Sequence, residues 1–273
     1  MDKSTILDRL HQLPAMPKVV QEVMGSFRDE HTGSATLAHK IALDQGLSAR
    51  VLRVANSSFY GLAREVGSIQ DAVMVLGFDT VRSLVVSAGF TRIFPATVNG
   101  VFDCHAYWKR SIRVASYTEA LAQCLGRTRQ LSFTAGLFHD VGQLVLSICI
   151  PEQFADLLSQ QKASGAGLIE LERRVLGFDH AEIGAEMARR WNFPRDIEHA
   201  IHYWRNPERE PVMPVTSMVA VAVLIEYGLN SDDLMKRIPA TLCEHMQLSW
   251  ERIEPCMPQA DQLDAMVDMM LET

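Results

Sequence analysis

The chain has 273 residues, of which 48% are hydrophobic and 22% are charged, and its formal net charge is −7 at pH 7. This composition excludes an intrinsically disordered chain, and the length allows one or two domains. The acidic balance argues against a protein that binds duplex DNA through a general basic surface, so we expect no nucleic-acid partner.

Cysteine usage and hydropathy predict a cytoplasmic protein. The five cysteines are scattered and form no C-x-x-C pair, which argues against a disulfide framework and against a cysteine-based zinc site. Charges interrupt the first ten residues, so no export signal is expected there. The apolar run 218–225 is shorter than the ~18 residues of a membrane span, so we expect no membrane insertion.

The first part of the chain has helical periodicity. Apolar residues within 16–27 follow the 3-4-3-4 spacing of one helix face. A second helix is predicted to start at Thr32 or Ser34 and to end at Gly46, and a third to start at Ser48.

A capping pattern marks the next helix. Ser68 and Asp71 form a capping box ahead of 69–76, and another helix is expected to begin near Asp79 or Thr80. Proline and glycine then interrupt the chain around 95–100, where helix formation is disfavoured. We therefore predict an N-terminal lobe over 1–98 and a second helical lobe over 99–230.

Long helical segments continue in the second lobe. One helix is predicted over 107–125 and another over 131–150, ended by Pro151. The β-branched run 219–225 is the one strand candidate, but without a partner strand we assign it to a helix. With a helical, methionine-rich tail over 231–273, the predicted fold class is all-α.

The dipeptide His139-Asp140 is the sharpest chemical feature, and it lies within GLFHDVGQL. An imidazole nitrogen and a carboxylate oxygen suit zinc, manganese or iron. Alternatively, the two side chains satisfy hydrogen bonds inside a core. The dipeptide alone leaves both possibilities open.

Further motifs give this stretch a context. They are LPAMP at 13–17, ALDQGL at 42–47, VANSSFYG at 54–61 and IQDAV at 69–73. GLFHDVGQLVL resembles the metal-binding helix of the HD phosphohydrolase superfamily, and the other motifs resemble the companion lobe of the HDOD family, the HD-related output domains of bacterial signalling proteins. The resemblance covers about residues 10–225 and implies an all-α fold in which an N-terminal helical lobe packs on an HD-like lobe.

The resemblance implies metal ligands, some of which this chain keeps. His139 and Asp140 match the central pair of the HD superfamily. His180 matches a histidine that the cyclic-dinucleotide phosphodiesterase branch uses for a second metal. These three residues are the candidate remnant metal ligands.

Other ligand positions are lost. Arg110 stands where a ligand histidine is expected, a later His-His pair falls on Trp204 and Arg205, and the final aspartate falls in the apolar run 219–225. A catalytic divalent site usually needs three protein ligands, so we expect a degenerate site with no cofactor. We expect Arg110 to pair with Asp140 in place of a metal charge.

A polar corner follows the helix that ends near residue 55. Asn56 tolerates a left-handed backbone and can satisfy free helix-end carbonyls, and Ser57 or Ser58 can cap the next element of the chain. Alternatively, this corner contacts a partner or small ligand. Asn56, Ser57 and Arg110 are therefore the candidate binding residues.

The resemblance implies a regulatory role in bacterial signalling, and we expect a non-catalytic protein that acts by binding a protein partner or a small ligand. The chain leaves little room for a fused sensor domain, so we expect the signal to arrive through that partner or ligand. The alternative is a divalent-metal-dependent phosphohydrolase or phosphodiesterase that acts on a nucleotide or cyclic dinucleotide through His139, Asp140 and His180. A scaffold without a ligand is a third hypothesis.

Overall fold

The computed structural model describes residues 3–13, 15–27, 34–93, 97–98, 102–127, 131–209, 211–228 and 231–272, which are almost entirely helical. In this part of the chain, β structure is confined to a short antiparallel pair, β1 (Thr97–Val98) and β2 (Phe102–Asp103). The predicted all-α class is therefore confirmed. None of the described helices is both long and apolar enough to cross a membrane.

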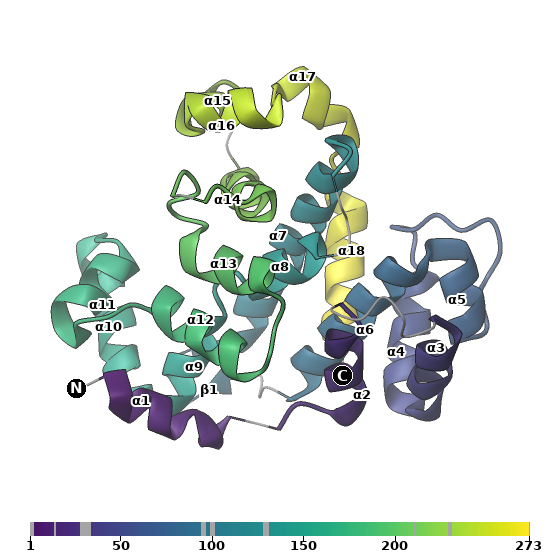
Figure 1. Ribbon diagram of the computed structural model, residues 1–273, viewed down its shortest axis with the longest axis horizontal. Helices are drawn as coiled ribbons and strands as arrows, with labels where there is room; N and C mark the ends of the chain where they lie inside the picture. The colour runs from purple at the N-terminus through teal and green to yellow at the C-terminus, as the bar shows by residue number, and fades with distance from the viewer. Residues whose placement is uncertain are drawn as a thin grey trace.

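The N-terminal lobe contains a group of helices that lies to one side in Figure 1. They are α2 (Lys18–Gly25), α3 (Ser34–Leu43), α4 (Gln45–Ala55), α5 (Ile69–Leu76) and α6 (Phe78–Ile93). The Ser68 hydroxyl accepts from the Asp71 amide at 3.0 Å and donates to the Asp71 carboxylate at 2.7 Å, so the predicted pairing of these two residues at the start of α5 is confirmed.

The HD-like lobe surrounds the long helix α7, against which α8 and α14 pack. Its helices are α7 (Cys104–Cys124), α8 (Ser132–Phe138), α9 (Val141–Cys149), α10 (Pro151–Ser164), α11 (Leu168–Leu176), α12 (His180–Arg190), α13 (Arg195–Tyr203) and α14 (Pro214–Glu226). The run 219–225 lies in α14, as predicted.

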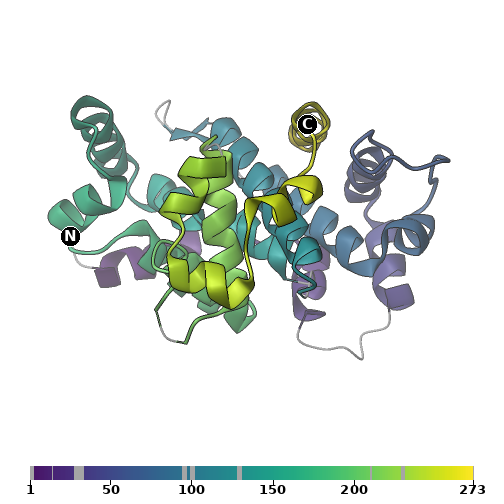
Figure 2. The ribbon, with the colours of Figure 1, turned by 90° about the horizontal axis from the view of Figure 1, so that it is seen from above.

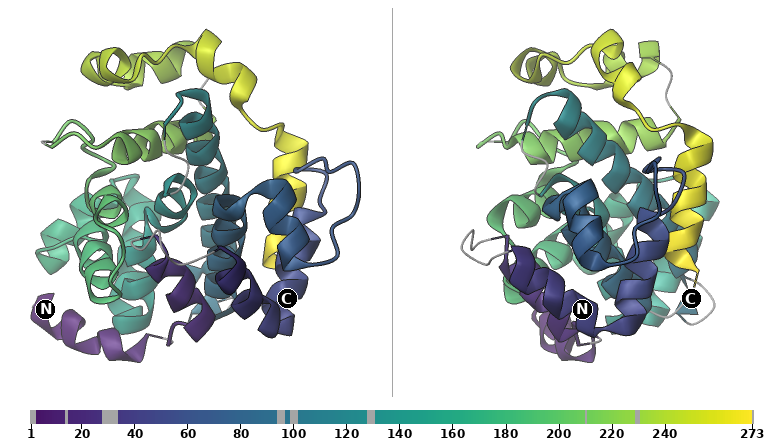
Figure 3. Two further views of the ribbon diagram at one scale, coloured as in Figure 1. Left: turned by 45° about the vertical axis from the view of Figure 1, so that its right-hand side comes forward. Right: turned by 90° about the vertical axis from the view of Figure 1, so that its right-hand side faces the viewer.

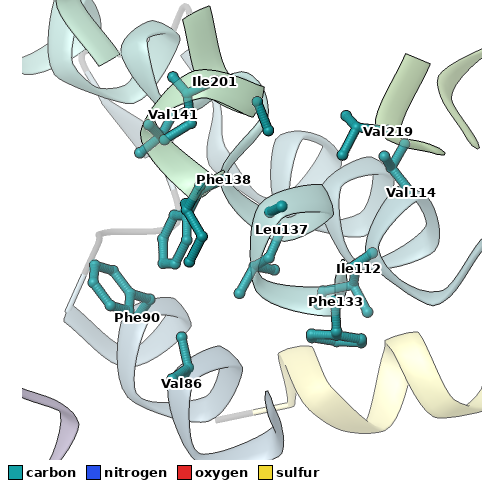
Figure 4. Packing of buried hydrophobic residues seen from close by; sticks show 14 of the residues in the cluster. Val86, Phe90, Ile112, Val114, Phe133, Leu137, Phe138, Val141, Ile201 and Val219 are labelled. Atoms are coloured by element: carbon teal, nitrogen blue, oxygen red, sulfur yellow. The ribbon is translucent and has the colours of Figure 1, made fainter. Parts of the chain in front are cut away.

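Aromatic side chains join the two lobes. Phe90 on α6 meets Phe138 at the end of α8, with ring centroids 4.5 Å apart in an edge-to-face arrangement (Figure 4). Phe193 packs against both rings, and all three side chains are fully or almost fully buried. The hydrophobic core is therefore continuous across the lobes, as the resemblance implies.

Some predicted helix boundaries are wrong. The segment 131–150 is two helices, because the chain breaks at His139 and Asp140 between α8 and α9. Pro151 begins α10 instead of ending a helix, which suits the first helical turn where no amide hydrogen is needed. Gly46 lies inside α4, because the Asp44 carboxylate accepts from the Leu47 amide and starts that helix earlier than predicted.

The two ends of the chain pack across the lobes. The helix α1 (Lys3–Arg9) and the turn η1 (Leu10–Gln12) contact α9, and the Arg9 guanidinium donates to the Cys149 carbonyl at 2.9 Å. The predicted division into 1–98, 99–230 and 231–273 stays a prediction, but the packing of α1 links the first of these segments to the second.

The C-terminal helices wrap the other side of the molecule. They are α15 (Ser231–Arg237), α16 (Ala240–Met246), α17 (Trp250–Ile253), η2 (Glu254–Cys256) and α18 (Ala260–Leu271). Figure 2, which looks down on the molecule, shows α15 to α17 in front of the HD-like lobe, and Figure 3 shows the yellow helix α18 running back along the helices of the N-terminal lobe. Since α18 contacts α4, α6 and α7, it bridges the two lobes.

Helices α9 and α12 approach so closely that one glycine is required. A Cβ atom on Gly142 would lie 1.7 Å from the His180 carbonyl oxygen, so Gly142→Ala must push the two helices apart. We expect it to lower the free energy of unfolding by about 1–3 kcal/mol in urea denaturation, as overpacking does. Gly25→Ala is the control, because its Cβ would meet no atom within 4 Å. An equal effect of the two substitutions would contradict this account.

Candidate functional site

Polar side chains from several helices converge on the break between α8 and α9. We call this group the HD centre, and its members are Arg110 on α7, His139 and Asp140 at the break, Gln143 on α9, Glu172 on α11, His180 on α12, and Trp204 and Arg205 just after α13. Figure 1 shows these helices gathered together in the HD-like lobe. The break itself places the Asp140 carboxylate among the donors from the other helices.

The Asp140 carboxylate accepts from protein donors on both oxygens. Oδ1 lies 3.1 Å from an Arg205 nitrogen and 3.3 Å from the Trp204 indole nitrogen. Oδ2 lies 2.9 Å from the Gln143 amide nitrogen and 3.4 Å from an Arg110 nitrogen. Burial by itself raises the pKa of Asp140, but opposing charges, with Arg205 foremost, hold that pKa well below its usual range. Asp140 is therefore an ionised, buried carboxylate.

His180 lies between two buried carboxylates. Its Nδ1 is 2.7 Å from Glu172 Oε2, and its Nε2 is 3.4 Å from Asp140 Oδ1. Burial lowers the pKa of His180, but the contacts with Asp140 and Glu172 outweigh burial and raise it to about 9. The ring is thus mostly protonated at neutral pH, so a metal ion would have to displace the proton on Nε2, which lies near Asp140 without forming a hydrogen bond.

His139 has the opposite protonation state. Burial lowers its pKa to about 4, so the ring is neutral. Nδ1 lies 2.7 Å from the Gly136 carbonyl oxygen and must be the protonated nitrogen, since a carbonyl only accepts. Its ring also packs edge-to-face on Trp204, with centroids 5.4 Å apart. Two histidines a few ångströms from the same carboxylate therefore differ in charge.

The residues of the HD centre do not fit a divalent metal ion. Among the described residues, no group of three or more histidine, cysteine or acidic side chains is placed to hold one. Both Asp140 oxygens already accept hydrogen bonds, and His180 is protonated. Glu226, at the end of α14, is the carboxylate next to the run 219–225 in which the final ligand was expected. It pairs with Arg113 at 2.7 Å and is not among the groups that contact Asp140.

The structure places Arg110 with His139, Asp140 and His180 as the sequence predicts, but the network contains two members that sequence analysis missed. Glu172 sits beside two arginines in a charged segment typical of a solvated face, so its burial is not evident from its neighbours. The signal that could have found it is its position just before the turn at Gly177 that leads to His180. Gln143 lies within the GLFHDVGQL motif, three residues after Asp140 and thus on the same side of the helix.

Asn56 lies in the N-terminal lobe, away from the HD centre, and its side chain holds the loop between α4 and α5 in place. Its backbone φ is −85°, so it does not adopt the left-handed conformation. Its side chain donates to the Val66 carbonyl at 3.0 Å and accepts from the Val66 amide at 2.9 Å. The predicted contact with helix-end carbonyls is therefore wrong. Ser57 is buried and caps no helix, since α5 is capped by Ser68. A binding role for this corner stays a prediction.

Asn56→Val is expected to lower the free energy of unfolding by about 1–3 kcal/mol, because two backbone groups of Val66 lose their partner. Urea denaturation measures the effect. Ser58→Ala is the matched control, because Ser58 is exposed and its removal should change stability by less than about 0.5 kcal/mol. An unchanged midpoint in Asn56→Val would show that the loop does not depend on this side chain.

The sequence pattern of the HDOD domain matches residues 13–207, which is more than half of the chain. The chain belongs to the HDOD family. This confirms the resemblance drawn from the motifs.

Similar proteins agree with this assignment. A crystal structure from Shewanella amazonensis, provisionally named a phosphohydrolase, is 29% identical, with a TM-score of 0.80 and 98% of each chain covered. An HDOD domain protein of unknown function from Geobacter sulfurreducens shares the fold, with 24% identity, a TM-score of 0.76 and coverage of 98% and 97% of the two chains.

Two further relatives are longer than this HDOD chain. A Marinobacter aquaeolei structure, provisionally named a signal transduction protein, is 25% identical with a TM-score of 0.76, over 97% of this chain and 61% of the other. An uncharacterized Treponema pallidum protein is 24% identical over 253 residues, which are 91% of this chain and 49% of that protein. The chain thus spans about half the length of that curated relative.

Proposed function

We propose that this HDOD protein is a non-catalytic regulatory component of bacterial cytoplasmic signalling, which acts by binding a protein partner or a small ligand. The main supporting observation is that both oxygens of the Asp140 carboxylate accept hydrogen bonds from side chains of the protein itself. A metal ion would have to displace these donors before it could bind the carboxylate.

The replacements at the ligand positions act together. The resemblance places ligand histidines at the positions of Arg110, Trp204 and Arg205, and here all three side chains donate to Asp140. Arg205 also stacks on the Trp204 ring, with its guanidinium carbon 3.8 Å from the ring centroid. Because guanidinium stays charged at any working pH, the two arginines supply positive charge where a metal would otherwise supply it.

Loss of the metal removes the chemistry that hydrolysis of a phosphoester needs. A bound divalent ion activates water and stabilises the charge that develops on phosphoryl oxygens. The remaining groups of the HD centre are a neutral His139 and a His180 held as a cation between carboxylates. His139 keeps a free lone pair on Nε2, but one imidazole and a carboxylate that already accepts hydrogen bonds fall short of the three protein ligands that a catalytic metal site usually needs.

The relatives support both this proposal and its alternative. The Marinobacter protein's name favours a role in signal transduction. The Shewanella protein's name favours the alternative, a divalent-metal-dependent phosphohydrolase or phosphodiesterase that uses His139, Asp140 and His180. For that alternative, His180 must lose its proton and the arginines must release Asp140.

Hydrolysis assays separate the two hypotheses. With magnesium, manganese, iron or zinc added, we expect background turnover of nucleotides and cyclic dinucleotides, equal in the wild type and in Asp140→Ala. Metal-dependent hydrolysis by the wild type that disappears in Asp140→Ala would overturn the regulatory proposal and establish the alternative.

A further inference from the structure

Two cysteines that are far apart in the sequence meet where the C-terminal segment crosses the end of α7. Cys124 is the last residue of α7, and Cys256 is the last residue of η2. The Cys124 thiol donates to the Arg252 carbonyl oxygen at 3.0 Å, and the Cys256 thiol donates to the same oxygen at 3.8 Å. Because both sulfurs contact one oxygen atom, they lie near each other.

The electrostatics of Cys124 also reflect the nearby Cys256 thiol. Burial, a hydrogen bond with Cys256 and the proximity of that second sulfur raise the pKa of the Cys124 thiol to about 11. Cys256 is exposed and Cys124 is partly buried, so an oxidant in solution reaches Cys256 first.

We propose that Cys124 and Cys256 are a redox-sensitive modification site, at which a peroxide forms a reversible disulfide between α7 and the C-terminal segment. The Cys256 thiolate attacks hydrogen peroxide, the O–O bond breaks, and a sulfenic acid and hydroxide form, the latter taking up a proton to become water. The Cys124 sulfur then attacks the sulfenic sulfur, so that the S–S bond forms and the S–O bond breaks. The Cys124 proton leaves with the hydroxyl group as a second water. In total, two thiols give two electrons and two protons to one peroxide.

The disulfide would fix a segment that holds the lobes together. Helix α18 follows η2 and is tied to both lobes by charge: Asp264 and Asp268 pair with Arg113 and Lys109 on α7, and the Arg50 guanidinium donates to the Met270 carbonyl at 3.1 Å. A bond at Cys256 restrains the start of this contact, and it closes a long loop in the unfolded chain. Oxidation is therefore expected to stabilise the packing of α18 against both lobes. This site is separate from the HD centre and does not depend on the proposed function.

Peptide mapping of the oxidised full-length protein tests the proposal. After treatment with hydrogen peroxide and blocking of free thiols with N-ethylmaleimide, a non-reducing tryptic digest should contain the peptide 114–127 joined to the peptide 253–273. The number of free thiols, counted in denaturant, should fall by two from the five of the reduced chain, and dithiothreitol should restore them. The melting temperature of the wild type should rise on oxidation and return on reduction.

Matched variants make the result specific. Cys124→Ser and Cys256→Ser should each abolish the linked peptide and the rise in melting temperature. Cys243→Ser, which removes another incompletely buried cysteine of the same C-terminal segment, should leave both unchanged. The proposal is overturned if all thiols stay free, if Cys256 is oxidised without forming the link, or if the link joins two chains and gives a disulfide-bonded dimer on a non-reducing gel.

Discussion

Asp140→Ala is expected to lower the free energy of unfolding by about 3 kcal/mol while leaving nucleotide hydrolysis at background. The substitution removes the counterion of Arg110, Arg205 and His180 at once. His180 is completely buried and keeps one carboxylate, Glu172. The side chains of Arg110 and Arg205 are 37% and 34% exposed, so water partly replaces the lost contact. The expected loss is therefore at the lower end of the usual range for a broken buried pair.

Two comparisons make this measurement specific. Asp140→Asn keeps an acceptor oxygen and nearly the same volume, so it should lose less stability than Asp140→Ala. Glu65→Ala removes an exposed carboxylate and should change the free energy of unfolding by less than about 0.5 kcal/mol. If Asp140→Ala were as stable as Glu65→Ala, the carboxylate would not be the centre of the network.

The free energy of unfolding should also fall by about 3 kcal/mol as the pH rises from about 6.5 to about 9, because of His180. The pKa of His180 is about 9 in the folded protein, above the ordinary value of 6.5. A raised histidine pKa gives a stabilisation that is complete below the unfolded value and is lost as the pH rises through the folded value. Urea denaturation across this range measures the loss.

His180→Gln is the variant that isolates this effect. Its free energy of unfolding should lack the decrease between pH 6.5 and 9, apart from the contributions that it shares with the wild type. Should this variant fail to fold, an NMR titration of the wild-type imidazole gives the same information. A ring that loses its proton near pH 6.5 would contradict the placement of His180 between two carboxylates.

His139 is expected to lower the free energy of unfolding at acidic pH. Its pKa of about 4 lies below the ordinary value, so the unfolded chain takes up its proton first as the pH falls. Its contribution to stability is therefore lost between about pH 6.5 and pH 4. Together, the two histidines predict maximal stability near pH 6 to 7.

The fold was largely predictable from the sequence because apolar spacing and capping residues are local signals. The N-cap at Ser68 could be derived in this way. The helical state of the run 219–225 followed instead from the absence of a partner strand. The break at His139 and Asp140 could not, since no glycine or proline marks it. It depends on contacts that Asp140 makes with distant helices, and these are tertiary.

The candidate site was predictable only in part, for the same reason. The resemblance to the HD superfamily implied that Arg110 takes a ligand position and pairs with Asp140, and the two side chains lie 3.4 Å apart. The roles of Trp204 and Arg205 as donors were not predicted, because a missing ligand does not indicate what its replacement contacts. The protonation of His180 depends on Glu172, whose burial requires the folded turn between α11 and α12.

Manganese binding tests most directly whether arginines have replaced a metal in the HD centre. Manganese suits imidazole and carboxylate ligands and has little affinity for thiols, so the cysteines should not obscure the result. Elemental analysis after dialysis against manganese should find no stoichiometric metal in the wild type and no difference between the wild type and Asp140→Ala. Close to one manganese ion per wild-type chain, absent from Asp140→Ala, would contradict the replacement of the metal by Arg110 and Arg205.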